Sequence, residues 1–269
     1  MLDTVVAVIL DFFIGDPESF PHPVKLMGKM IFLEEKLARK LAKTSRRLKI
    51  AGLFIVIFNM LTAFFVPFFI LNSLKEYQLA YHIVNVYLIY SCIAARSDVE
   101  TVAENTSDGV IAPLLYVMIF GAPGGLCYKF INTMDSMLGY MNEKYIDLGF
   151  FPAKNDDLFN YIPSRLTGVL MCLSSIFRFD VKNGFKIMLR DRSNHKSPNC
   201  AYPEGAVAGL LNVQLGGDNY YFGKIVHKPK IGDSIRELEK NDIKRTIEIM
   251  YRAEILLLFI YVLILAIFF

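Results

Sequence analysis

The chain has 269 residues, of which 54% are hydrophobic and 20% charged, and its formal net charge is only +3. Because the net positive charge is small and no basic stripe carries interleaved aromatic residues, the composition argues against a nucleic-acid-binding protein. The apolar fraction exceeds the roughly 45–50% of soluble domains, and long uncharged runs accompany it, so the sequence predicts a membrane protein. Its four cysteines show no CxxC spacing, which favours buried hydrophobic thiols over disulfides or zinc ligands.

The first 49 residues precede the first long apolar run. Residues 2–14 are apolar but too short to span a bilayer, so we expect a buried or partly inserted helix. A loop rich in glycine and proline follows and holds Asp16 and His22. Residues 30–49 are basic and amphipathic, which is typical of a helix that lies on an anionic membrane surface.

The apolar runs predict an all-α, polytopic membrane protein that forms a single domain over residues 1–269. About four to five membrane segments are expected, at 50–74, 77–95, 109–128, 158–177 and 254–269. Basic residues flank them at 25–49 and 178–252, so the positive-inside rule places these flanks on the cytoplasmic side of the plasma membrane. The sequence GAPGG at 121–125 offers a break that would make the third segment a re-entrant helix pair, with the polar loops gathered on the cytoplasmic face.

A polar, acidic stretch leads into the third apolar run. If it is helical, Glu100, Glu104 and Asp108 lie on one face at spacings of four residues, where like charges repel and a cation or basic partner would relieve them. The alternative is that acids collect here because the helix dipole favours them at an N-terminus. Amide and hydroxyl side chains around the acids favour a binding site: Asn105, Ser107, Asn132 and Ser136. A further acid, Asp135, lies between the last two.

A second acidic group precedes the segment at 158–177. Asp156 and Asn160 would share a helix face, and with Asp157 they suit a hard cation such as Mg²⁺. Helix capping together with a snorkelling Arg165 is the alternative explanation.

A basic, hydroxyl-rich loop follows at residues 190–199 and leads into the start of a helix, which makes a plausible phosphate site. Its candidate residues are Arg192, His195, Lys196, Ser197 and Asn199. A solvated basic loop is the alternative. The chain has no P-loop, because the nearest match, from Gly217 to Ile225, has the wrong spacing and lacks the Ser or Thr that would hold Mg²⁺.

Four blocks, taken together and in order, resemble the CobD/CbiB family of membrane proteins in cobalamin biosynthesis. The blocks are DFFIGDPESFPHPVKLMGK, ETVAENTSDGVIAPLLY followed by GAPGG and INTMDSMLGY, NDDLFNYIPSRLTG, and DRSNHKSPNCAYPEGAVAGLLNVQLGGDNYYFG. The resemblance covers about residues 3–225. It implies adenosylcobinamide-phosphate synthesis, in which a carboxylate of adenosylcobyric acid is joined to (R)-1-amino-2-propanol or its O-phosphate by a carbon–nitrogen ligase that uses ATP and Mg²⁺.

Under this resemblance the polar residues acquire candidate roles. Amide formation requires an activated carboxyl, most simply an acyl phosphate, so Mg²⁺ and basic side chains must neutralise phosphoryl charge. We expect Mg²⁺ ligands among Glu104, Asp108, Asp135, Asp156 and Asp157. Phosphate contacts are expected from Arg165, Arg192 and Lys196, and His195 or His22 would take the proton from the amine. Substrate contacts are expected from Asn105, Ser107, Asn132, Ser136, Ser197 and Asn199.

The chain departs from the family pattern at Arg96–Ser97. Family members carry several dozen more residues there, including an Arg-Asp-Thr element, whereas this chain runs directly into the acidic stretch. Two alternatives to the ligase therefore stay open, a non-catalytic regulatory or signalling relative and a small-molecule transporter with a midplane site. The expected partners are a corrinoid, aminopropanol or its phosphate, the lipid bilayer and, in an oligomer, further copies of the chain.

Overall fold

The computed structural model describes residues 2–14, 22–93, 99–221 and 224–268. The chain forms two compact units, each built from two separate stretches. Unit 1 comprises Met1–Ala94 and Ala112–Phe159, and unit 2 comprises Ala95–Ile111 and Asn160–Phe269. The expectation of a single domain stays a prediction. Asp16 and the junction at Arg96–Ser97 lie outside the described residues.

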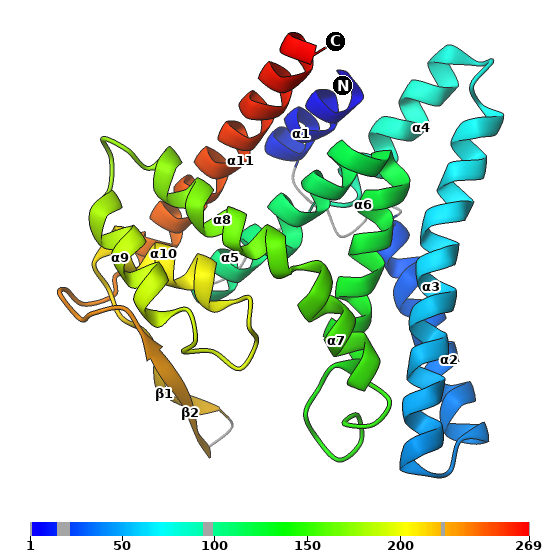
Figure 1. Ribbon diagram of the computed structural model, residues 1–269, viewed down its shortest axis with the longest axis horizontal. Coiled ribbons are helices and arrows are strands. Elements are labelled where there is room, and N and C mark those ends of the chain that lie inside the picture. The colour runs from blue at the N-terminus through cyan, green and yellow to red at the C-terminus, as the bar shows by residue number, and fades with distance from the viewer. Residues whose placement is uncertain (1, 15–21, 94–98, 222–223, 269) are drawn as a thin grey trace. The chain divides into compact units, whose positions relative to one another are not determined.

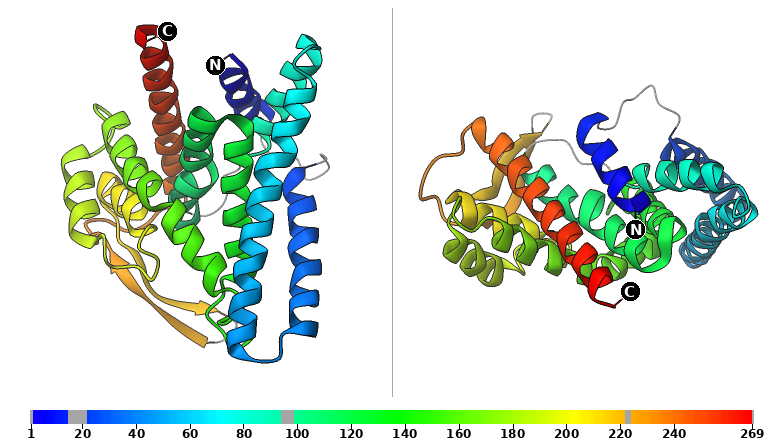
Figure 2. Two further views of the ribbon diagram at one scale, coloured as in Figure 1. Left: turned by 45° about the vertical axis from the view of Figure 1, so that its right-hand side comes forward. Right: turned by 90° about the horizontal axis from the view of Figure 1, so that it is seen from above.

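Unit 1 is helical in its described residues (Figure 1). Its helices are α1 (Leu2–Ile14), α2 (Pro23–Leu41), α3 (Ser45–Ser73), α4 (Gln78–Tyr90), α6 (Ala112–Leu138) and α7 (Phe150–Phe159). Side-chain caps start α2 and α3, because His22 Nδ1 accepts the Val24 N–H and Thr44 Oγ1 accepts the Arg47 N–H. Figure 2 shows α2 and α3 side by side, and both contribute to an apolar core shared with α6.

Helix α6 folds back on itself at Gly121. This glycine has φ 68° and ψ −168°, which is not helical and which an L side chain rarely adopts. The rings of Tyr116 and Tyr128 stack with their centroids 5.1 Å apart, whereas continuous helix between them would separate the two residues by about 18 Å. The break predicted in the sequence at 121–125 is therefore confirmed.

Unit 2 consists of helices and one hairpin (Figure 1). Its helices are α5 (Val99–Asn105), the π-helix η1 (Thr106–Ile111), α8 (Tyr161–Ser174), α9 (Val181–Asp191), α10 (Ala201–Leu211) and α11 (Asn241–Phe268). Helices α9 and α10 approach closely through glycine. A Cβ on Gly209 would lie 2.4 Å from the Asn183 backbone oxygen, so no larger residue fits there without a backbone shift.

A β-hairpin corrects the all-α expectation. Strand β1 (Leu215–Tyr221) pairs antiparallel with β2 (Lys224–Ile231), with Leu215 opposite Ile231 and an irregularity between Leu215 and Gly217. Gly216 and Gly217 both have positive φ, at the point where the pairing of the strands is irregular. The mostly helical part of the fold prediction is confirmed, and the strict all-α class is wrong.

Three helices in the described part of the chain are long and apolar enough to cross a membrane: Ser45–Ser73, Glu100–Leu138 and Asn241–Phe268. The first and third overlap the predicted segments 50–74 and 254–269 in all but the last residue of each segment. The second contains 109–128 but is interrupted at Gly121, so it is not one straight rod. The predicted segment 77–95 contains α4, and 158–177 contains α8. With 13 and 14 residues these helices extend only about 20 Å, too short to span alone. The predicted four to five spans are therefore not confirmed.

Candidate active site

The acidic stretch before α6 begins with a helix in unit 2, and its first carboxylate is paired. Glu100 accepts a hydrogen bond from Lys228 Nζ at 2.8 Å and another from the Gly216 backbone N–H at 2.9 Å. The expectation that a basic partner would relieve the crowded acids is therefore confirmed at Glu100.

The second carboxylate of this stretch meets a thiol. Cys200 Sγ donates to Glu104 Oε1 at 2.9 Å. Burial, followed by the negative charges of Glu104 and Asp108, holds the pKa of the Cys200 thiol far above its usual range. The thiol is therefore protonated, so it serves as a hydrogen-bond donor and not as a nucleophile.

The third carboxylate lies in the π-helix η1. Asn160, which is buried, connects it to Ser107: the Ser107 hydroxyl donates to Asn160 Oδ1 at 2.7 Å, and Asn160 Nδ2 donates to the Asp108 carboxylate. Single-turn π-helical insertions are frequent at functional sites because they re-aim side chains. Asn160 directly follows the last residue of α7, Phe159, so a helix face shared with Asp156 stays a prediction.

Glu204 belongs to the same acidic group, although it is not among the site residues predicted from the sequence. Its side chain is 93% buried, as only 7% is exposed, and no hydrogen bond or ion pair reaches its carboxyl from the described residues. Burial and, after it, the charges of Glu104 and Glu100 raise its pKa to about 8, and the charge of Lys228 opposes them. The sequence signal was a single acid within the small, apolar run AYPEGAVAGLL at 201–211.

Arg165 projects from α8 and is held flat between aromatic rings. Its guanidinium carbon lies 3.4 Å from the ring centroid of Tyr161 and 4.4 Å from that of Tyr202. Nη1 donates to Asn199 Oδ1 at 3.3 Å, and Nη2 donates to the Pro198 carbonyl at 3.5 Å. No carboxylate in the described chain forms an ion pair with Arg165, so its charge is available to an anionic ligand.

The loop before α10 is ordered by its own side chains. His195 Nδ1 accepts the Ser197 N–H at 3.0 Å, and Ser197 Oγ accepts the Asn199 N–H at 3.2 Å. Asn199 is buried, whereas Arg192 and Lys196 are exposed. The loop therefore presents two cations to solvent and fixes the amide that contacts Arg165.

The remaining acidic candidates belong to unit 1. Asn132 Nδ2 donates to Asp156 Oδ1 at 3.4 Å, which joins α6 to α7, and Asp157 forms an ion pair with Lys154 at 3.2 Å. Asp135 is half-buried one turn after Asn132. The hydrogen bond between Asn132 and Asp156 brings a predicted substrate contact and a predicted metal ligand together within unit 1.

Three predicted residues have local structural roles or lie at the surface. His22 caps α2, and Ser136, which is exposed, donates to the Asn132 carbonyl at 3.0 Å. Asn105 is half-buried at the end of α5.

The donor set fits Mg²⁺ only as a site shared with phosphate. Within the described ranges, no three His, Cys, Asp or Glu side chains are grouped closely enough to hold a metal ion. Mg²⁺ is usually bound by one or two carboxylates together with substrate phosphates and water, so a preformed protein cage is not required. Each unit offers oxygen ligands of this kind, the Asp108 carboxylate beside Asn160 in unit 2 and the Asp156 carboxylate beside Asn132 in unit 1, and a bound Mg²⁺ would neutralise phosphoryl charge.

The fold and the site together define a helical membrane protein with a partly buried acidic group and an arginine without a carboxylate partner among the residues described. The chain is similar over nearly its whole length to proteins named cobalamin biosynthesis protein CobD. It is 47% identical to the one from Clostridium tetani, covering 98% of this chain and 97% of the relative. It is 41% identical to that of Geobacter metallireducens (94% and 93% covered) and 35% identical to that of Klebsiella pneumoniae (97% and 96%). No solved structure matches.

The CobD/CbiB protein family model matches residues 4–97 and 95–250, and the chain belongs to this family. The two matched segments meet at 95–97, where the sequence analysis expected family members to carry additional residues. The alignment with the Clostridium tetani protein also extends over 307 residues, more than this chain contains. Relatives therefore include residues that have no counterpart here.

Proposed function

We propose that the protein acts in cobalamin biosynthesis as an ATP- and Mg²⁺-dependent ligase that joins adenosylcobyric acid to (R)-1-amino-2-propanol or its O-phosphate. The observation that carries the proposal is the family match over nearly the whole chain. The grouping of Glu104, Asp108, Glu204 and Arg165 within unit 2 supports it, because acyl activation needs acidic and cationic groups together.

The proposed reaction has two steps. Transfer of a phosphoryl group from ATP to the carboxylate gives an acyl phosphate and ADP. The amine then attacks the carbonyl carbon, so that the C–N bond forms, the C–O bond to phosphate breaks, and the amine proton passes to a base. Arg165 on α8 would bind a phosphate, and Arg192 and Lys196 are exposed in the loop before α10.

The other roles follow from residue chemistry. Mg²⁺ ligands are proposed among Glu104, Asp108, Asp135, Asp156 and Asp157, and His195 or His22 is proposed as the base. Asn105, Ser107, Asn132, Ser136, Ser197 and Asn199 are proposed to contact substrates. Unchanged activity and Mg²⁺ dependence in both Asp135→Asn and Asp156→Asn would refute the metal assignment in unit 1.

The proposed topology places the polar loops on the cytoplasmic side of the plasma membrane. Support comes from the reversal of α6 at Gly121, since two half-spans return the chain to the side from which it entered. A cysteine introduced at the exposed Ser136 should then react with membrane-impermeant reagent only after the cells are opened. Labelling of intact cells would contradict this topology.

A non-catalytic regulatory relative is the second candidate. The observation in its favour is the junction of the two matched segments at 95–97, which places the missing residues directly before the acidic stretch. Loss of a segment at that position could remove a part of the catalytic site.

Complementation separates the two candidates. The chain is expressed in a corrinoid-requiring strain that lacks its own family member and is supplied with cobyric acid. Growth that Asp108→Ala abolishes and the exposed control Glu237→Ala preserves is the expected result. Failure to grow with well-inserted protein, with growth restored by cobinamide, would refute the ligase.

A further inference from the structure

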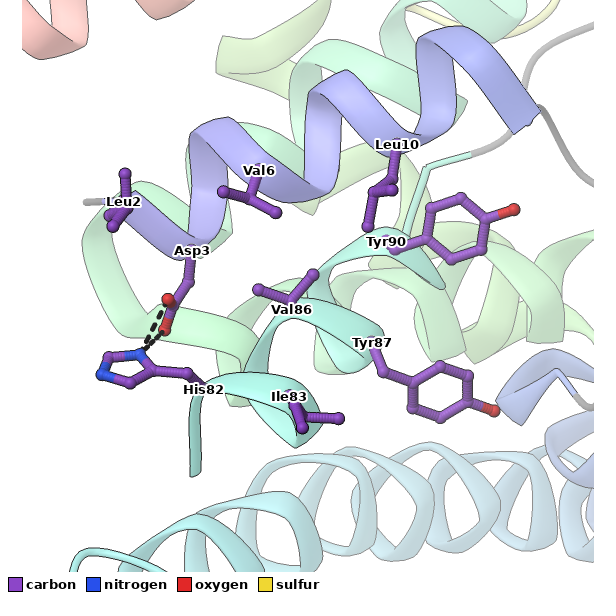
Figure 3. A pocket seen from close by; sticks show the side chains of 9 residues that line it. All are labelled: Leu2, Asp3, Val6, Leu10, His82, Ile83, Val86, Tyr87 and Tyr90. Carbon is purple, nitrogen blue, oxygen red and sulfur yellow. Dashed lines mark hydrogen bonds and ion pairs between the residues drawn. The ribbon is translucent and has the colours of Figure 1, made fainter. Parts of the chain in front are cut away.

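A pocket of about 660 Å³ lies between α1 and α4 in unit 1 (Figure 3). This volume is within the range of about 300–1,000 Å³ typical of small-molecule sites. Helix α1 lines the pocket with Leu2, Val6 and Leu10, which share one face at spacings of four residues. None of the residues assigned to the reaction lines it.

Helix α4 supplies the opposite wall with Ile83, Val86, Tyr87 and Tyr90 (Figure 3). Protein interiors are close-packed, so an opening of this size is not an ordinary packing defect. Water gains few hydrogen bonds from apolar walls, and apolar cavities remain dry or take apolar ligands. The main part of the occupant is therefore apolar.

One end of the pocket is polar. Asp3 accepts hydrogen bonds from His82 Nδ1, at 2.8 and 3.0 Å to its two oxygens, and from Asn85 Nδ2 at 2.7 Å. The negative charge at this end of the pocket is the Asp3 carboxylate, which His82 and Asn85 hold in place. Ionisable groups in membrane helices are expensive and are retained where they pair or bind a ligand. The charge here is complementary to a cationic head group.

The protein surface around the pocket is apolar. Helix α4 follows the candidate span α3 after a short turn, and α1 packs against α4. Both helices also expose large apolar side chains that do not line the pocket, including Phe13 at 80% and Leu79 at 75%. Exposed apolar surface of this kind on a membrane protein contacts lipid, so bilayer lipid is the most abundant apolar ligand available.

We propose that the pocket between α1 and α4 binds one phospholipid with an ammonium head group. Its acyl chain lies between Val6 and Val86, and its ammonium group lies beside Asp3. The proposal is independent of the ligase reaction, because it uses different residues and a different ligand.

Native mass spectrometry of the full chain tests the proposal. The protein is equilibrated in mixed micelles that contain equal amounts of phosphatidylethanolamine and phosphatidylglycerol, and the lipid that remains bound is identified. We expect one retained lipid and about a fivefold preference for phosphatidylethanolamine, the ratio that one ion pair near 1 kcal/mol provides. Val86→Phe, which fills the pocket, should lose the lipid, while Leu61→Phe, at an exposed position of α3 that does not line the pocket, should retain it.

A second variant tests the head group without changing the volume of the pocket. Asp3→Asn should still retain one lipid but bind the two phospholipids equally. This variant also keeps the test decisive if Val86→Phe does not fold. No retained lipid in the wild type, equal retention by Val86→Phe and Leu61→Phe, or an unchanged preference in Asp3→Asn would each overturn the proposal.

Discussion

Glu204→Gln should make the stability of the protein much less dependent on pH. In the folded chain, burial and, after it, the charges of Glu104 and Glu100 raise the pKa of Glu204 from the usual 4.5 to about 8, against the opposing charge of Lys228. Below about pH 4.5 the carboxyl is protonated in both the folded and the unfolded state. Between pH 4.5 and 8 the unfolded chain releases the proton and the folded chain keeps it, so the stability falls as the pH rises.

The magnitude follows from the two pKa values. Each pH unit in this window lowers the free energy of unfolding by up to about 1.4 kcal/mol, so the wild type loses roughly 3 kcal/mol between pH 5 and pH 8 through this one group. Glutamine cannot ionise and removes this contribution. For a chain of this size the difference corresponds to about 6–12 °C in Tm.

Thermal unfolding in detergent at pH 5 and pH 8 measures the effect. At pH 5 the comparison of wild type with Glu204→Gln gives mainly the effect of the amide itself, and the change in their difference at pH 8 isolates the ionisation. The exposed Glu237→Gln, also in unit 2, controls for the loss of one carboxylate. An equal difference between Glu204→Gln and wild type at both pH values would refute the reasoning, since it would mean that the Glu204 pKa is not raised.

Three further predictions concern unit 2. Arg165→Lys should lower ligase activity about tenfold or more with little change in Tm, because lysine keeps the charge but loses the planar group stacked between two tyrosine rings; activity equal to wild type would contradict this. Asn160→Ala should lower the free energy of unfolding by about 2–3 kcal/mol in a denaturant titration, because it removes the hydrogen bonds to Ser107 and Asp108; a change below about 0.5 kcal/mol would show that they contribute little. Gly209→Ala should lower the free energy of unfolding by about 1–3 kcal/mol, because the new methyl group meets a backbone oxygen. The control Gly28→Ala, whose methyl would lie 3.7 Å from its nearest neighbour, should be neutral or stabilising. Similar effects of the two variants would refute the close approach of α9 and α10.

The sequence located the break in α6 correctly because its cause is local. Gly121 permits a positive φ and Pro123 fixes its own φ, and both effects act at the residue itself, whatever packs around it. The span lengths were less accurate. Uncharged residues from 77 to 95 indicated a full crossing, but α4 is described only as Gln78–Tyr90, because an apolar run does not reveal where a helix ends.

The sequence predicted which residue types form the site, but it predicted few of their hydrogen-bond and ion-pair partners. Glu100, Glu104 and Asp108 were identified as a group, yet their partners come from distant parts of the chain: Lys228, Cys200 and Asn160. Glu204 was missed because its distinguishing property is burial beside other acids, and burial does not follow from neighbouring sequence. The hairpin was missed because its glycines resemble a loop until the two strands pair.

The sequence by itself determined the membrane class, the family resemblance and the local break at Gly121, since composition, motif order and backbone stereochemistry are properties of contiguous residues. The tertiary structure decided which acids share an environment, how Arg165 is held between two rings, and that α1 and α4 enclose a pocket with Asp3 and His82 at one end. These features join residues as far as 128 positions apart. Their energies depend on distance and burial, which exist only once the chain has folded.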